Sequence, residues 1–174
     1  VAVGPALLLQ EFGNLGTILI SLPLALLLGL KKEAIGACYS INRDSNLGLT
    51  TDIFGPDAPE TRGTFAVYIV GSVIGTVFIS ILASIVASWH IFDPIALGMA
   101  CGVGSGSMMT AAAGTLGEIY PQQAESIMIM GGASDMLTGI TGIYKGTFEA
   151  LPLTKKLYAI LEPKIGHKNN KEAK

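Results

Sequence analysis

The sequence predicts an all-α membrane protein, a polytopic helical bundle with two discontinuous or re-entrant segments. Composition is the first reason: 50% of the 174 residues are hydrophobic and 14% are charged, whereas soluble domains average about 25% charged residues. The mean hydropathy of +0.55 points the same way. The second reason is that three apolar stretches meet the roughly 20 residues that a helix needs to cross a bilayer. The third is that two stretches between them begin and end like membrane segments but are polar or glycine-rich at the centre.

Three spans are predicted, in chain order over residues 6–30, 64–89 and 123–145. The first is leucine-rich and ends at Lys31-Lys32. The second carries almost no charge and ends at Trp89, a residue typical of the membrane–water interface. The third contains Asp135 near its middle. An acid at that depth indicates either a proton or Na⁺ site or a structural hydrogen bond.

The two interrupted segments cover residues 33–60 and 93–120. Aligned with each other, they form a weak internal repeat in which Gly36 matches Gly98 and Pro56 matches Pro121. The offset drifts from 62 to 65 residues along the alignment. Each segment could cross the membrane as a broken helix or re-enter from one face, and the charge pattern is compatible with both.

The chain ends in a more polar region. Beyond a transmembrane domain over residues 1–146, the pattern predicts an amphipathic surface helix over 147–163 and a solvated tail over 164–174. Seven of the eleven basic residues lie at this end of the chain. The positive-inside rule therefore predicts a multi-pass protein of the bacterial inner membrane with a cytoplasmic C-terminus, and Lys31-Lys32 on the same side.

The run from Gly102 to Ser107 alternates glycine with valine and serine. Irregular backbone at membrane depth is stable only where it is buried in protein or lines a cavity, and glycine permits close approach of a ligand. We expect one helix to end here and a new helix N-terminus to be capped by Ser105 or Ser107. No strand precedes the run and no Walker lysine follows it, which argues against a nucleotide-binding loop. The competing interpretation is helix packing by small residues, which also suits Gly71 and Gly75.

Charged residues inside the first interrupted segment are a second sign of a site. Arg43 and Asp44 cannot face lipid, where a charge costs about 2.5–3.5 kcal/mol on insertion scales. They could form a structural ion pair, or they could recognise an anion and a cation in one site, with Arg43 on a carboxylate. The predicted substrate-binding residues are Ser40, Asn42, Arg43, Ser45, Asn46, Gly102, Gly104, Ser105, Gly106 and Ser107. The predicted ion-coupling residues are Asp44, Thr51, Asp52 and Asp135.

Two resemblances bear on function. "ALGMACGVGSGSMMTAAAGTLGEIYP" and "GGASDMLTGITGIYKGTFEALPLTKKLY" resemble the C-terminal half of a family of uncharacterised bacterial integral membrane proteins, a domain of unknown function whose longer N-terminal part is lacking here. More loosely, the glycine-serine loop and "YPQQAESIMIMGG" are similar to the second re-entrant loop of the 2-hydroxycarboxylate symporters, which carry citrate or malate with Na⁺. This chain has Ser107-Met108 where an acid typically follows that loop's glycines. The looser resemblance implies a transporter without specifying its substrate.

These patterns predict a secondary active transporter, or half of one, that moves a small anionic organic solute coupled to Na⁺ or H⁺. A passive channel and a non-transporting structural subunit remain as alternatives. An enzyme is not expected, because no nucleophile–base set appears. The expected partners are the lipid bilayer, the solute, and a second copy or a complementary N-terminal half, because five spans are few for a lone carrier. No nucleic-acid partner is predicted, nor is any cofactor or metal centre other than Na⁺ as a coupling ion.

Overall fold

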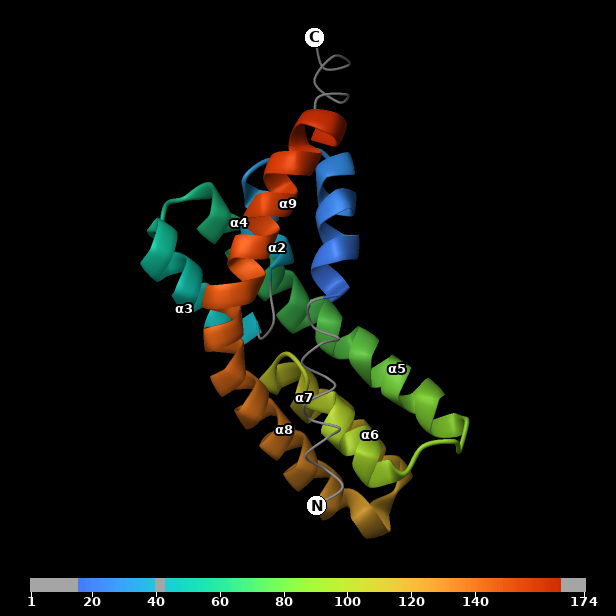
Figure 1. The fold of residues 1–174 in the computed structure, drawn as a ribbon. Helices are drawn as coiled ribbons and strands as arrows, with labels where there is room; N and C mark the ends of the chain where they lie inside the picture. The colour runs from blue at the N-terminus through green and yellow to red at the C-terminus, as the bar shows by residue number, and fades with distance from the viewer. Residues whose placement is uncertain (1–15, 40–42, 167–174) are drawn as a thin grey trace. The chain divides into compact units, whose positions relative to one another are not determined.

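The computed structural model describes residues 16–39 and 43–166, and every regular element in this part of the chain is a helix (Figure 1). The all-α class is therefore confirmed for the described residues. The chain forms two compact units. Unit 1 comprises residues 1–41, 45–67 and 142–174, and unit 2 comprises residues 42–44 and 68–141.

Unit 1 is built around two apolar clusters. Its elements are the apolar helix Gly16–Leu27, α2 (Glu33–Cys38), most of α3 (Arg43–Phe54), the start of α4 (Pro59–Val70), the end of α8 (Ala124–Lys145), the π-helical turn η3 (Gly146–Ala150), α9 (Leu151–Leu161) and the π-helical turn η4 (Glu162–Gly166). Tyr39 is fully buried in one cluster and Leu22 in the other. Leu157 and Tyr158 of α9 pack against both clusters. The apolar side of the predicted surface helix is therefore engaged in the core of unit 1.

Unit 2 is a helical layer centred on α7 (Gly106–Ile119). Its other elements are the end of α4, the π-helical turn η1 (Gly71–Gly75), α5 (Thr76–Ser88), α6 (Pro94–Cys101), the 3₁₀ turn η2 (Pro121–Gln123) and most of α8. Helix α7 packs against α5 and α6. The core of the unit joins Ala87, Ala113, Leu116 and Ile127.

The start of α6 follows from local sequence. The carboxylate of Asp93 accepts hydrogen bonds from the backbone N–H groups of Ile95 (2.9 Å) and Ala96 (3.3 Å). Pro94 occupies the first helical position, where its missing N–H has no cost. The helix ends one residue before Gly102. Its length of 8 residues makes it a half-helix rather than a membrane span.

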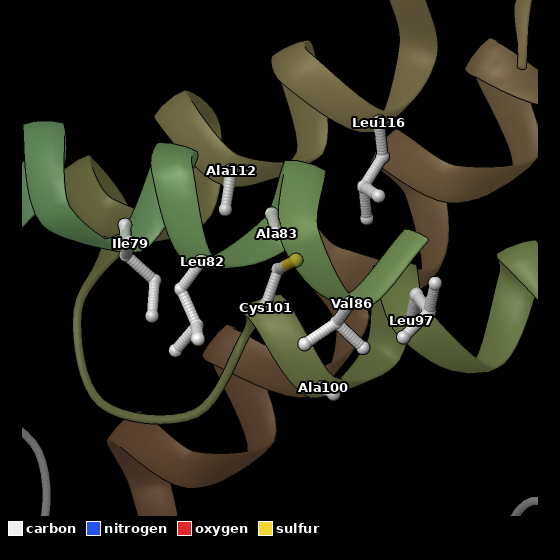
Figure 2. Close-up of a pocket in the computed structure, with 9 residues that line it drawn as sticks. All are labelled: Ile79, Leu82, Ala83, Val86, Leu97, Ala100, Cys101, Ala112 and Leu116. Carbon is white, nitrogen blue, oxygen red and sulfur yellow. The ribbon is translucent and has the colours of Figure 1, made fainter. Parts of the chain in front are cut away.

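An apolar hollow of about 210 Å³ lies between α5, α6 and α7 (Figure 2). Its lining contains no charged or polar side chain: Ile79, Leu82, Ala83, Val86, Leu97, Ala100, Cys101, Ala112 and Leu116. The hollow therefore offers no group that would recognise a polar solute, and the polar site is elsewhere in unit 2.

One helical run among the described residues is long and apolar enough to cross a membrane. It extends over 30 residues from Pro59 to Ser88, through α4, η1 and α5, with a mean hydropathy of 2.4 in its most apolar part. None of that part is buried, and Val73 and Phe78 are 65% and 64% exposed. The helix Gly16–Leu27 is apolar but shorter. The other predicted crossings stay predictions.

The two segments that align in sequence have a similar order of elements. In each, a short helix (α2 or α6) precedes a second helix (α3 or α7) and a long helical run with a glycine-initiated π turn. The short helices also use matching glycines. A Cβ on Gly36 would overlap the backbone of Glu60 in unit 1, and a Cβ on Gly98 would lie 2.7 Å from the carbonyl oxygen of Ile127 in unit 2. The aligned glycines therefore make the same kind of close contact with the following long helix.

Candidate functional site

The break in the second of the predicted interrupted segments is described, whereas that in the first falls largely outside the described residues. Helix α2 ends at Cys38 and α3 begins at Arg43, and the intervening Ser40 and Asn42 lie outside the described residues. Helix α6 ends at Cys101 and α7 begins at Gly106. Between them Gly104 has φ of +117°, a backbone conformation that side-chain-bearing residues rarely adopt.

The starts of α3 and α7 meet within unit 2. The backbone N–H of Arg43 donates a hydrogen bond to the carbonyl oxygen of Gly104 (2.8 Å). The N–H of Gly106 donates to Oδ2 of Asp44 (3.1 Å). Because a helix N-terminus carries unpaired N–H groups and a partial positive charge, this carboxylate is a favourable cap for α7. The two interrupted segments are thus joined by reciprocal contacts that involve their charged pair.

The predicted serine cap of α7 is wrong. Ser105 precedes the helix in an extended conformation, but its side chain makes no capping hydrogen bond. Its hydroxyl instead accepts from Nη2 of Arg43 (2.6 Å), and Ser107 accepts from the same nitrogen (2.7 Å). The two hydroxyls lie 3.1 Å apart. The guanidinium of Arg43 therefore binds the serine oxygens that were expected to cap α7, and the carboxylate of Asp44 accepts the N–H of Gly106 in their place.

Arg43 is the most unusual side chain of this cluster. It is only 6% exposed, yet its Nε and Nη1 atoms have no hydrogen-bond partner among the described residues. The ion pair found in that part of the chain, at 3.8 Å, joins Arg62 and Glu33 on the surface and does not involve Arg43. The Tyr68 ring lies beneath the guanidinium, 5.0 Å from its carbon to the ring centroid. A buried guanidinium with two nitrogens that lack hydrogen-bond partners is costly by itself and suits an anionic ligand.

Gly71 gives the guanidinium its space. A Cβ at Gly71 would lie 2.6 Å from Nη1 of Arg43 and 3.4 Å from Cε of Met108. Sequence reasoning interpreted Gly71 as a packing residue and did not single out Tyr68. Both contacts join segments far apart in sequence, and glycine and tyrosine are common in membrane helices, so the chain offered no local signal for either.

Asp135 approaches the same place from α8. A Cβ on Gly106 would lie 3.2 Å from Oδ2 of Asp135 and 3.9 Å from Oδ2 of Asp44. Oδ1 of Asp135 is buried and has no hydrogen-bond partner within the described part of the chain. Gly102 makes this approach possible, because a Cβ there would lie 2.7 Å from the backbone nitrogen of Asp135. Glycines at 102 and 106 therefore let the α6–α7 break lie directly against α8.

The other predicted site residues that the structure describes belong to unit 1. Asn46 is 1% exposed, and its backbone carbonyl accepts from the hydroxyl of Tyr39 (3.2 Å). Ser45 is half-buried on the same helix. Thr51 donates to the carbonyl oxygen of Leu47 one turn earlier (2.7 Å), the usual bond of a helical threonine. Asp52 is exposed. The cluster described above therefore contains Arg43, Asp44, Gly102, Gly104, Ser105, Gly106, Ser107 and Asp135 of the predicted set, all in unit 2.

The cluster gathers charged and hydrogen-bonding groups. It offers a guanidinium, two hydroxyls, two carboxylates and the N-terminus of α7. Among the described residues, no three His, Cys, Asp or Glu side chains gather as a metal site would require. Such a set can recognise charged groups of a small molecule.

The described residues form a helical protein in which the starts of α3 and α7 meet at a buried arginine. The chain belongs to a family described as protein of unknown function (DUF3100), which matches residues 1–160. The resemblance to a domain of unknown function is thereby confirmed. Comparison with curated proteins and with solved structures gave no match.

Proposed function

We propose that this protein is a polytopic membrane protein that transports a small carboxylate-bearing solute, and that Arg43 binds the carboxylate. It acts as a secondary active transporter, or as half of one, and uses Na⁺ or H⁺ as the coupling ion. The observation that carries the proposal is the buried guanidinium at the meeting point of two helix breaks, with two nitrogens that lack partners.

The membrane part of the proposal rests on composition and exposed surface. The run Pro59–Ser88 has the length and hydropathy of a span, and its most apolar part is not covered by the rest of the chain. The helix Gly16–Leu27 also exposes large apolar side chains: Ile20 is 76% exposed. Leu28, which directly follows the helix, is 72% exposed. Water is a poor solvent for such surfaces, whereas lipid chains match them.

Broken helices have a particular use in a bilayer. Backbone that leaves the helical pattern must be buried or face an aqueous cavity, and transporters place their binding sites at such breaks near the membrane centre. The N-termini of α3 and α7 both begin at this cluster. Because helix N-termini favour negative charge, they add to the attraction of Arg43 for a carboxylate.

Coupling is assigned to the two carboxylates beside Gly106. Asp44 and Asp135 are near enough to that glycine for both to sense one bound cation or proton. A cation between them would relieve the repulsion of two like charges. The proposal also includes a second copy of the chain or a complementary half, since the spans of one chain are few for a complete carrier.

Uptake by proteoliposomes tests the proposal. We expect a labelled small carboxylate to accumulate in vesicles when a Na⁺ or pH gradient is imposed, and Arg43→Gln to reduce uptake by roughly tenfold or more, the scale of a lost charge-assisted hydrogen bond. Arg43→Lys should also be impaired, because lysine lacks the planar fork. Arg62→Gln is the matched control, since Arg62 is exposed and pairs with Glu33 on the surface.

The outcomes separate the alternatives. Flux that does not depend on either gradient would support a channel. No flux of any carboxylate, together with loss of stability in Arg43→Gln, would support a structural subunit and overturn the proposal. A transport role predicts only a small change in stability, because Arg43→Gln removes the hydrogen bonds to Ser105 and Ser107 together with the cost of burying the charge.

A further inference from the structure

Two opposite charges with unused hydrogen-bonding capacity flank the first turn of α7. On one side, the Arg43 guanidinium contacts Ser105 and Ser107 through Nη2, while Nε and Nη1 have no partner. On the other, Asp135 presents Oδ2 toward Gly106, while the buried Oδ1 has no partner among the described residues. An anion would satisfy only the first of these groups.

We propose that the solute of this site is a zwitterion of the α-amino-acid type, whose carboxylate binds Arg43 and whose ammonium group binds Asp135. This inference rests on the transport function proposed above and narrows its substrate class. Buried charges are stable in proteins when they are paired and hydrogen-bonded. A zwitterion pairs both charges at once without changing the net charge of the site.

The arrangement of donors around Arg43 agrees with this assignment. Both Ser105 and Ser107 accept from Nη2, so these serines do not use Nε or Nη1, which lack partners and are assigned to the ligand. The carboxylate would also lie near the N-terminal turn of α7, whose N–H groups favour negative charge.

Asp135, rather than Asp44, is the partner for the ammonium group. Asp44 already accepts the N–H of Gly106 and caps α7. Gly102, Gly104 and Gly106 add no side chain to the loop beside Asp135, and a Cβ on Gly104 would meet no atom within 4 Å. A small molecule with both groups on one carbon is therefore the ligand that matches these charges.

Binding of matched compounds to the purified full-length protein tests the proposal. Thermal shift and calorimetry would compare the common amino acids with their deaminated counterparts, for example alanine with propionate, and with simple amines, in Na⁺ and in K⁺ buffer. We expect at least one amino acid to bind roughly tenfold or more tightly than its deaminated counterpart, and simple amines to bind no better.

Variants of Asp135 identify the ammonium partner. Asp135→Asn should weaken binding of the amino acid to the level of its deaminated counterpart, without changing binding of the latter. Asp135→Glu keeps the charge and should retain part of the preference, which guards against a variant that merely fails to fold. Asp57→Asn, in the exposed turn between α3 and α4, is the control and should bind like the wild type.

The two proposals fail in different ways. If deaminated acids bind as tightly as amino acids, and more tightly in Na⁺ than in K⁺, the solute is a simple anion accompanied by a cation. The zwitterion proposal is then overturned while the transport proposal stands. If neither amino acids nor carboxylates bind or are taken up, both are overturned.

Discussion

Gly104 lies in the predicted break between α6 and α7, and its backbone conformation differs from that of a helix. Its φ of +117° is readily adopted only by glycine, and it lies between the half-helices α6 and α7. Its carbonyl oxygen accepts the N–H of Arg43, so the conformation of Gly104 also positions the charged pair. A change of backbone angle here would disturb the contact between the two interrupted segments.

Gly104→Ala should abolish or strongly reduce uptake while leaving the protein in the membrane. The new methyl group has room, because nothing lies within 4 Å of a Cβ at this position. The penalty comes from the backbone, where a disfavoured φ costs about 1–3 kcal/mol unless the loop shifts. Uptake and membrane yield would be measured side by side with Gly114→Ala, a change within α7 that also meets no neighbour. Normal uptake by Gly104→Ala would mean that this loop is not the site.

Gly71 shows the limit of reasoning from spacing. Its four-residue separation from Gly75 predicts helix packing, and both glycines do lie against other side chains of unit 2. The neighbour of Gly71, however, is Nη1 of Arg43, whereas that of Gly75 is the flexible Met108 side chain. A pattern of small residues predicts a close approach but carries no information about what approaches. Gly71→Ala would therefore disturb the guanidinium as well as packing.

At the scale of single helices, sequence pattern was informative where it depended on local chemistry. The apolar run, the Asp93-Pro94 start of α6 and the glycine break after Cys101 are all readable along the chain. The contacts between Arg43 and the two serines were not readable, because they join residues 62 and 64 positions apart and depend on how helices pack. The serine cap was mispredicted for the same reason, since local propensity favours serine and a distant carboxylate took its place.

The short helices α2 and α6 depend on close contact with the long helices that follow them. We expect Gly36→Ala and Gly98→Ala each to lower stability by about 1–3 kcal/mol, the usual effect of overpacking. The added methyl would overlap the Glu60 backbone in one case and approach the Ile127 carbonyl in the other. Both obstacles are backbone atoms, which cannot move aside as a flexible side chain can.

Thermal unfolding of the purified variants measures this effect. Gly48→Ala on α3 is the matched control, because a Cβ there meets nothing within 4 Å. Equal melting temperatures for Gly36→Ala, Gly98→Ala and Gly48→Ala would show that Gly36 and Gly98 are not packing positions. The claim that the two aligned glycines make equivalent contacts would then be wrong.

At the scale of the whole chain, the repeat relates two halves that share an order of elements but differ in chemistry. The first break is followed by an arginine and an aspartate, and the second by glycine and serine. In unit 2 the charged pair of one copy contacts the small polar residues of the other. The two segments thus contribute complementary groups: a donor and a carboxylate from the first, and hydroxyls and a helix N-terminus from the second.

The orientation of the chain in the membrane is the last prediction, and it follows from basic residues alone. Seven of the eleven lie from Lys145 onward and two more form Lys31-Lys32, so the positive-inside rule places both regions in the cytoplasm. A C-terminal alkaline phosphatase fusion should therefore be inactive, and a C-terminal green fluorescent protein fusion should fluoresce. The opposite pair of results would place the C-terminus outside.

Paired fusions in the acidic loops before Pro59 and before Ala124 would then decide whether the two interrupted segments cross the membrane or re-enter it. Crossing segments put both loops outside, whereas re-entrant segments leave the two loops on opposite faces of the membrane. The backbone N–H of Arg43 is hydrogen-bonded to the carbonyl oxygen of Gly104. Either topology must therefore place these two residues at the same depth in the bilayer.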